Sequence, residues 1–145
     1  MIGIRRQLRF PADVERLAEM RTAVREVARA CDAPPDCLDD LVQAVDEAAT
    51  NIIVHGYRNE PGMIDFTAEL VGDDLIFTLE DRAPTFDPNV VPEPDLATPP
   101  HQRRPGGMGV HLMRLATDSI DHRPRPGGGN ILTLTRSRVP RSKEG

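Results

Sequence analysis

Residues 63–80 alternate between apolar and polar side chains in two runs that a short turn separates. The apolar members, which occupy every second position of each run, are Ile64, Phe66, Ala68 and Leu70, then Leu75, Phe77 and Leu79. A period of two is typical of a strand with one face in a core and one face in water. Because Gly72, Asp73 and Asp74 favour a tight turn between the runs, the segment is predicted to be a β-hairpin with one face to be covered.

Three helices are predicted around this hairpin. Apolar residues recur at helical spacing from Asp13, a predicted N-cap, to about residue 31. The same spacing recurs from Pro34-Pro35 to Gly56, and a third helix is predicted to begin at Gly107 and to end near residue 118. These helices provide the apolar stripes that can cover the hairpin.

Further strands are predicted at 4–10, near 120–122 and at 130–136, which completes an α+β fold. The expected architecture is a two-layer α/β sandwich, with helices on one face of a mixed, mostly antiparallel sheet. A chain of 145 residues without repeats or shifts in composition is expected to form a single domain over 1–145, with its core at about 8–136. Residues 137–145 are expected to be a disordered basic tail.

Charge and hydropathy exclude several classes of function. The net charge is −5 and the pI is near 5.3, which argues against direct nucleic-acid binding because such proteins carry a basic face. Apolar runs are shorter than the ~20 residues that span a bilayer, and no secretory signal is visible at the N-terminus. We therefore expect a cytoplasmic protein without membrane contact, in which Cys31 and Cys37 remain reduced.

Proline is concentrated in one segment, because seven of the 14 prolines lie between residues 83 and 108. A compact domain rarely contains a loop of about 25 residues unless that loop is a lid or a binding segment. The segment is therefore predicted to take part in function.

Three motifs could provide chemistry. Glu47 and Asn51 lie one turn apart on the second predicted helix, opposite its apolar stripe. Asp81 follows the second strand of the hairpin. Gly107 and Gly109 begin the third helix, where bare backbone N–H groups and the helix dipole favour an anion. Taken alone, each motif is more often structural: Glu47 and Asn51 as a solvated helix face, Asp81 as a turn-forming residue, and the glycines as a flexible hinge.

In this order, however, the motifs resemble the N, G1 and G2 boxes of the GHKL (Bergerat) ATP-binding fold. They read Glu-x-x-x-Asn-x-x-x-His-Gly-Tyr, Asp-x-Ala-Pro-x-Phe-Asp-Pro and Gly-Gly-x-Gly-Val-x-Leu-Met-x-x-x-x-Asp. The resemblance is to the anti-sigma-factor serine/threonine kinase branch and covers about residues 8–136. The second motif departs from the usual Asp-x-Gly, because Ala83 occupies the glycine position and its methyl group would crowd an adenine.

The resemblance implies a site for ATP and Mg²⁺. Asn51 would bind Mg²⁺, and Asp81 would accept a hydrogen bond from the amino group of adenine. The nucleotide-binding residues would be Asn51, Asp81, Ala83, Gly107, Met108, Gly109 and Val110. The segment of about 83–107 would form the ATP lid, with Arg103 and Arg104 near the phosphates. Glu47 would be the catalytic base that takes a proton from the incoming hydroxyl group.

The function implied by the resemblance is that of an anti-sigma regulatory factor with protein kinase activity. It would bind a sigma factor or a comparable regulator and phosphorylate a serine or threonine of a small antagonist protein. A homodimer is also expected. Two other functions stay open: a nucleotide-dependent binding module without phosphotransfer, and a structural domain with a vestigial pocket, which the presence of both Glu47 and Asn51 disfavours.

Overall fold

The computed structural model describes residues 4–31, 33–85 and 107–137, with the backbone alone at 107–109. Its five strands are β1 (Arg5–Pro11), β2 (Met63–Val71), β3 (Asp74–Asp81), β4 (Ser119–Pro124) and β5 (Asn130–Arg136). They form one sheet in the order β1-β2-β3-β5-β4. All four neighbouring pairs are antiparallel, so this part of the chain contains no parallel pair and its sheet is not mixed.

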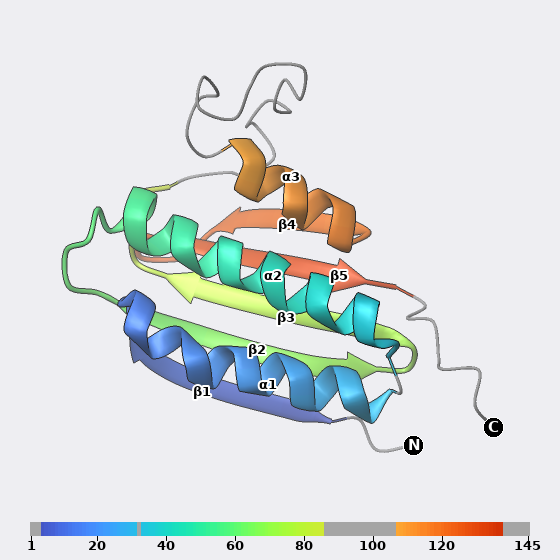
Figure 1. Ribbon diagram of the computed structural model, residues 1–145. Helices are drawn as coiled ribbons and strands as arrows, with labels where there is room; N and C mark the ends of the chain where they lie inside the picture. The colour runs from blue at the N-terminus through green and yellow to red at the C-terminus, as the bar shows by residue number, and fades with distance from the viewer. Residues whose placement is uncertain (1–3, 32, 86–106, 138–145) are drawn as a thin grey trace.

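Three helices, α1 (Leu17–Ala30), α2 (Pro35–Asn51) and α3 (Gly107–Ala116), all lie on one face of this sheet (Figure 1). The helix α2 packs between α1 and α3. The predicted two-layer α+β sandwich is therefore confirmed. Among the described helices, none is long and apolar enough to cross a membrane.

The core lies between the two layers and is built from the apolar positions of the predicted hairpin. The register of β2 and β3 places Phe66 opposite Leu79, and that of β3 and β5 places Phe77 opposite Leu134. The rings of Phe66 and Phe77 stack with their centroids 6.5 Å apart. Both side chains are fully buried, so the aromatic pair fixes the centre of the sheet against the helices.

The helix boundaries agree with the sequence except at the end of α2. Asp13 caps the turn η1 (Val14–Arg16), because its Oδ1 accepts a hydrogen bond from the Glu15 backbone N–H at 3.0 Å. The helix α2 begins at Pro35 but does not continue unchanged to Gly56. From Ile52 the chain forms a π-helical turn, η2 (Ile52–Gly56). Such turns widen the helix and occur often at functional sites.

Some of the predicted features lie outside the described residues. Most of the predicted lid is among them, at residues 86–106, and it includes Arg103 and Arg104. The predicted tail lies outside as well, from residue 138 onward.

Candidate functional site

A cavity lies between the helical layer and the ends of β3 and β5. Its lining combines apolar residues of α2, α3 and the sheet with a few polar side chains: Ala48, Asn51, Ile52, Gly56, Asp81, Met113, His122, Asn130 and Leu132. An apolar wall with a small number of convergent polar groups is the usual character of a small-molecule site. Its volume is about 30 Å³, and movement of the flexible Met113 side chain, which forms part of the wall, would widen it for a planar base.

Asp81, the last residue of β3, places a carboxylate inside this cavity although only 2% of the residue is exposed. Its Oδ1 accepts two hydrogen bonds, from the Ala83 backbone N–H at 2.8 Å and from Asn130 Nδ2 at 2.9 Å. Burial raises the pKa of Asp81, while these two donors and nearby His122 oppose the increase. Within the described chain Oδ2 takes no hydrogen bond, so it can accept one from a ligand.

Asn130, which the sequence analysis did not single out, faces Asp81 directly across β3 and β5. Its Nδ2 also lies 3.3 Å from the carbonyl oxygen of Ala83 and 3.1 Å from that of Pro84. A signal was present in the sequence, because Asn130 shares the inward-facing phase of β5 with Leu132 and Leu134. A polar residue at a strand position that is expected to be buried is informative, because buried positions are usually apolar.

The turn after Asp81 is held in place by close packing. Ala83 is 3% exposed and does not line the cavity. A methyl group added to Gly56 would lie 3.0 Å from the Ala83 Cβ, so the Ala83 methyl group faces the end of η2. The methyl group expected from the sequence to crowd an adenine thus packs toward Gly56, which is itself a lining residue of the cavity. If a nucleotide contacts Ala83, it does so through the backbone.

Tyr57 connects the same turn to the segment after η2. Its hydroxyl group accepts a hydrogen bond from the Arg82 backbone N–H at 2.8 Å and donates one to the Met63 carbonyl oxygen at 2.8 Å. Its ring lies against Gly62, where any Cβ would overlap it. Tyr57 therefore ties the start of β2 to the residue that follows Asp81, a contact that no local sequence pattern indicates.

On α2 the structure separates the two predicted polar residues by one helical turn. Asn51 lines the cavity at the junction of α2 with η2, whereas Glu47 does not. Burial, and next the negative charge of Asp46, raise the pKa of Glu47. Asp46 is itself held by Arg21 of α1 at 2.6 Å. A half-buried carboxylate with a raised pKa has the properties of a general base.

The first turn of α3 contains the predicted nucleotide-binding residues Gly107, Met108, Gly109 and Val110. The first four N–H groups of a helix have no partner within it and attract anions. The Val110 side chain is buried in the core, so only its backbone can contact a ligand. Met113, one turn after Gly109, lines the cavity, so α3 borders it.

The described residues contain no group of three or more His, Cys, Asp or Glu side chains that could hold a metal ion. This does not conflict with Mg²⁺, because Mg²⁺ bound with a nucleotide takes one or two protein oxygens and otherwise phosphate oxygens and water. The Asn51 amide makes no hydrogen bond within the described chain, and it lies on the cavity wall. The amide oxygen of Asn51 can therefore serve as the one protein ligand that such a Mg²⁺ ion needs.

Comparison with known proteins gives one family. Residues 10–136 match the family model described as Histidine kinase-like ATPase domain. The anti-sigma F factor of Thermoanaerobacter sp. (strain X514) is 27% identical over 130 residues, which cover 90% of this chain and 91% of that protein. The serine-protein kinase RsbW of Bacillus cereus (strain AH187) is 29% identical over 118 residues, covering 79% and 74%.

A solved structure shares the fold. The crystal structure of the RsbU and RsbW domains of Rv1364c from Mycobacterium tuberculosis superposes with a TM-score of 0.60 at 21% identity. The match covers 91% of this chain and 32% of that chain. At this identity the likeness supports the architecture and says nothing further about chemistry.

Proposed function

The chain belongs to the histidine kinase-like ATPase family, and we propose that it is an ATP-dependent serine/threonine protein kinase that acts as an anti-sigma factor. The observation that carries the proposal is that Asn51 and Asp81, from separate motifs, line one cavity. The helix α3, whose first turn would bind the phosphates, contributes Met113 to the lining of the same cavity. These are the candidate contacts for the base, the metal ion and the phosphates.

The nucleotide would lie with its base against Asp81 and its phosphates toward α3. The carboxylate would accept a hydrogen bond from the 6-amino group of adenine through Oδ2, which takes no hydrogen bond within the described chain. The backbone N–H groups of residues 107–110 would donate to phosphate oxygens, as helix N-termini commonly do. Arg103 and Arg104, which lie outside the described residues, are proposed to add positive charge there.

Transfer would proceed by attack of a partner's serine or threonine hydroxyl oxygen on the γ-phosphorus. A new P–O bond forms, the bond between the γ-phosphorus and the bridging oxygen breaks, and ADP leaves. Glu47 would take the hydroxyl proton as the attack proceeds. Mg²⁺, held by the Asn51 amide oxygen and the phosphates, would neutralise the charge that develops.

The partners are proposed from the names of the relatives. One relative is an anti-sigma F factor and another is a serine-protein kinase. We therefore propose that this chain binds a sigma factor or a comparable regulator, and that its phosphate acceptor is an antagonist protein with a reactive serine or threonine. We also propose that it forms a homodimer.

A second function, a nucleotide-dependent binding module without phosphotransfer, is favoured by one observation. Glu47 does not line the cavity that contains Asn51 and Asp81. In that case the nucleotide would control partner binding alone.

A transfer assay separates these functions. The purified protein is incubated with Mg²⁺, γ-labelled ATP and each co-encoded antagonist candidate, with an EDTA-treated sample as control. Label on a serine or threonine of one candidate supports the kinase. Nucleotide binding without transfer to any candidate supports the binding module. If calorimetry detects no binding of ATP or ADP, both functions are rejected.

A further inference from the structure

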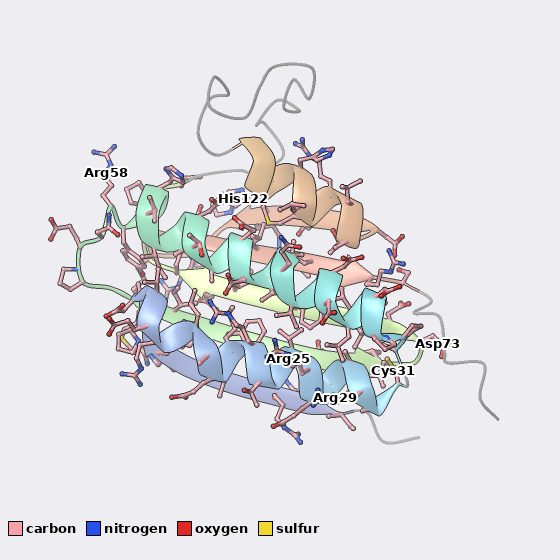
Figure 2. The ribbon with its side chains drawn as sticks, viewed as in Figure 1. Arg25, Arg29, Cys31, Arg58, Asp73 and His122 are labelled. Carbon is pink, nitrogen blue, oxygen red and sulfur yellow. The ribbon has the colours of Figure 1, made fainter. Side chains whose placement is uncertain are left out.

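Three polar side chains form a connected row at the end of the sheet, on the face that the helices cover. They are Asp81 on β3, Asn130 on β5 and His122 on β4, three neighbouring strands. Nε2 of His122 lies 2.7 Å from Oδ1 of Asn130, whose Nδ2 lies 2.9 Å from Oδ1 of Asp81. All three residues line the cavity, and Figure 2 shows His122 in the region between α2 and α3.

The surroundings of Asn130 fix the direction of each hydrogen bond. Its Nδ2 lies within hydrogen-bond distance of three acceptors, namely the Asp81 carboxylate and the carbonyl oxygens of Ala83 and Pro84. The amide oxygen therefore faces His122, and the orientation follows from the network. An amide oxygen only accepts, so Nε2 of His122 must be protonated and donate. His122 thus donates a hydrogen bond to Asn130, and Asn130 donates one to Asp81.

This row leaves one defined acceptor for a ligand. Oδ1 of Asp81 is occupied by Asn130 and by the Ala83 N–H, so the carboxylate can offer only Oδ2. Asn130 itself is 4% exposed and bonds on both ends of its amide, so it cannot turn without breaking several hydrogen bonds. The acceptor is therefore held in one place.

We propose that Asn130 and His122 are positioning residues that make this site select a 6-aminopurine nucleotide over a 6-oxopurine nucleotide. This inference rests on the proposed function, because it requires a purine base against Asp81. A 6-amino group donates a hydrogen bond to a fixed carboxylate oxygen. A 6-oxo group presents an oxygen to the same atom, and two acceptors repel each other.

Loss of Asn130 would weaken this selection in two ways. The carboxyl group would be free to rotate about its broad terminal torsion, so that its acceptor is no longer fixed. It would also lose one of the donors that oppose the rise in the pKa of Asp81, so the pKa would rise further. A protonated carboxyl group can donate to a 6-oxo group, so discrimination falls on both counts.

The test compares ADP with IDP, which differ at the 6-position of the base. Dissociation constants are measured by calorimetry for the wild type, Asn130→Ala, His122→Phe and His122→Gln. Thr133→Ala is the matched control, because Thr133 lies on β5 but points to the opposite face of the sheet. Thermal unfolding shows which variants are folded.

We expect the wild type and Thr133→Ala to bind ADP more tightly than IDP by about 10- to 100-fold, the range for a hydrogen bond to a charged group. In Asn130→Ala the ratio should fall close to one. His122→Phe should lower it to an intermediate value, and His122→Gln, which keeps an N–H donor, should restore most of it. A merely structural role would lower both affinities alike.

The outcomes that overturn the inference are distinct from failure of the proposed function. A wild type that binds neither nucleotide rejects both. A wild type that prefers ADP, together with a folded Asn130→Ala of unchanged preference, rejects the inference alone. If Asn130→Ala does not fold, the His122 variants decide, and equal preference in His122→Phe and the wild type rejects it.

Discussion

The methyl group of Ala83 packs against the bare α carbon of Gly56. A Cβ at Gly56 would lie 3.0 Å from that methyl carbon, closer than ordinary van der Waals contact. The family usually has a glycine two residues after this aspartate. Here that position is Ala83, and its methyl group fills space beside Gly56. The two positions therefore form one packing unit at the edge of the cavity, of which Gly56 is a lining residue and Ala83 is not.

This packing predicts different effects for two matched substitutions. Ala83→Gly should leave the dissociation constant for ADP nearly unchanged, while loss of a buried methyl group and greater backbone freedom lower the free energy of unfolding by about 1–2 kcal/mol. Gly56→Ala should be destabilising by about 1–3 kcal/mol through overpacking, and should weaken ADP binding because it displaces the Asp81 turn. Calorimetry and urea unfolding measure both. Tighter ADP binding by Ala83→Gly would show that the methyl group does obstruct the base.

Asp81→Asn should weaken adenine nucleotide binding by about 1.5–3 kcal/mol, the range for a hydrogen bond to a charged group. The wild-type affinity should also fall as the pH drops, because burial raises the pKa of Asp81 and only the ionised form offers two acceptors. Binding of ADP to wild type and variant is measured from neutral to mildly acidic pH. The pH dependence should be absent in Asp81→Asn, and an equal dependence in both would place the base elsewhere.

The same raised pKa has an opposite consequence for stability. A carboxyl group whose pKa is higher in the folded than in the unfolded protein binds protons more readily when folded. The contribution of Asp81 to stability is therefore fully present below its unfolded pKa and is lost as the pH rises through its folded pKa. Without nucleotide, Asp81→Asn should remove this part of the pH dependence of the free energy of unfolding.

The elements of this fold were predictable where their signal is local. The hairpin of β2 and β3 follows from the alternation of residues 63–80, and its apolar positions are the buried ones. The π-helical turn at Ile52–Gly56 was not predictable. It differs from an α-helix only in which backbone carbonyl oxygen accepts each N–H hydrogen bond, and the apolar pattern of these residues is compatible with an α-helix.

The site was predictable only in part, for a related reason. Asn51 and Asp81 were found from motifs, and the structure brings both to one cavity. The contact of Asn130 with His122 depends on the insertion of β5 between β3 and β4, which is a non-local property of the sheet. Neither local propensity nor spacing along the chain specifies that order.

Asn51→Ala should abolish Mg²⁺-dependent retention of nucleotide and leave the fold intact. The side chain is half-buried on the cavity wall and makes no hydrogen bond within the described chain, so its loss breaks no hydrogen bond described in the structure. ADP binding is measured with Mg²⁺ and with EDTA, and circular dichroism reports the fold. If the variant unfolds, Asn51 has a structural role instead.

A homodimer is expected in solution. The helices cover one face of the described sheet, and the other face carries the half-buried side chains of Ile76 and Ile131. Light scattering at micromolar concentration should give about twice the 16.0 kDa of one chain. A mass of one chain over the whole concentration range would contradict this expectation.

Glu47→Gln should abolish phosphotransfer and leave the affinity for ATP nearly intact. The proposed base contacts the incoming hydroxyl group and not the nucleotide, so its loss raises the free energy of the transition state and not that of the bound ground state. The expected decrease in the single-turnover rate is about 10²–10⁴-fold, the usual contribution of a general base. Since burial and Asp46 raise the pKa of Glu47, the wild-type rate should fall as the pH is lowered through that pKa. The control is Asp46→Asn, which keeps Glu47 but removes the neighbouring negative charge and should move this fall to lower pH. Transfer by Glu47→Gln at the wild-type rate would show that another group takes the proton.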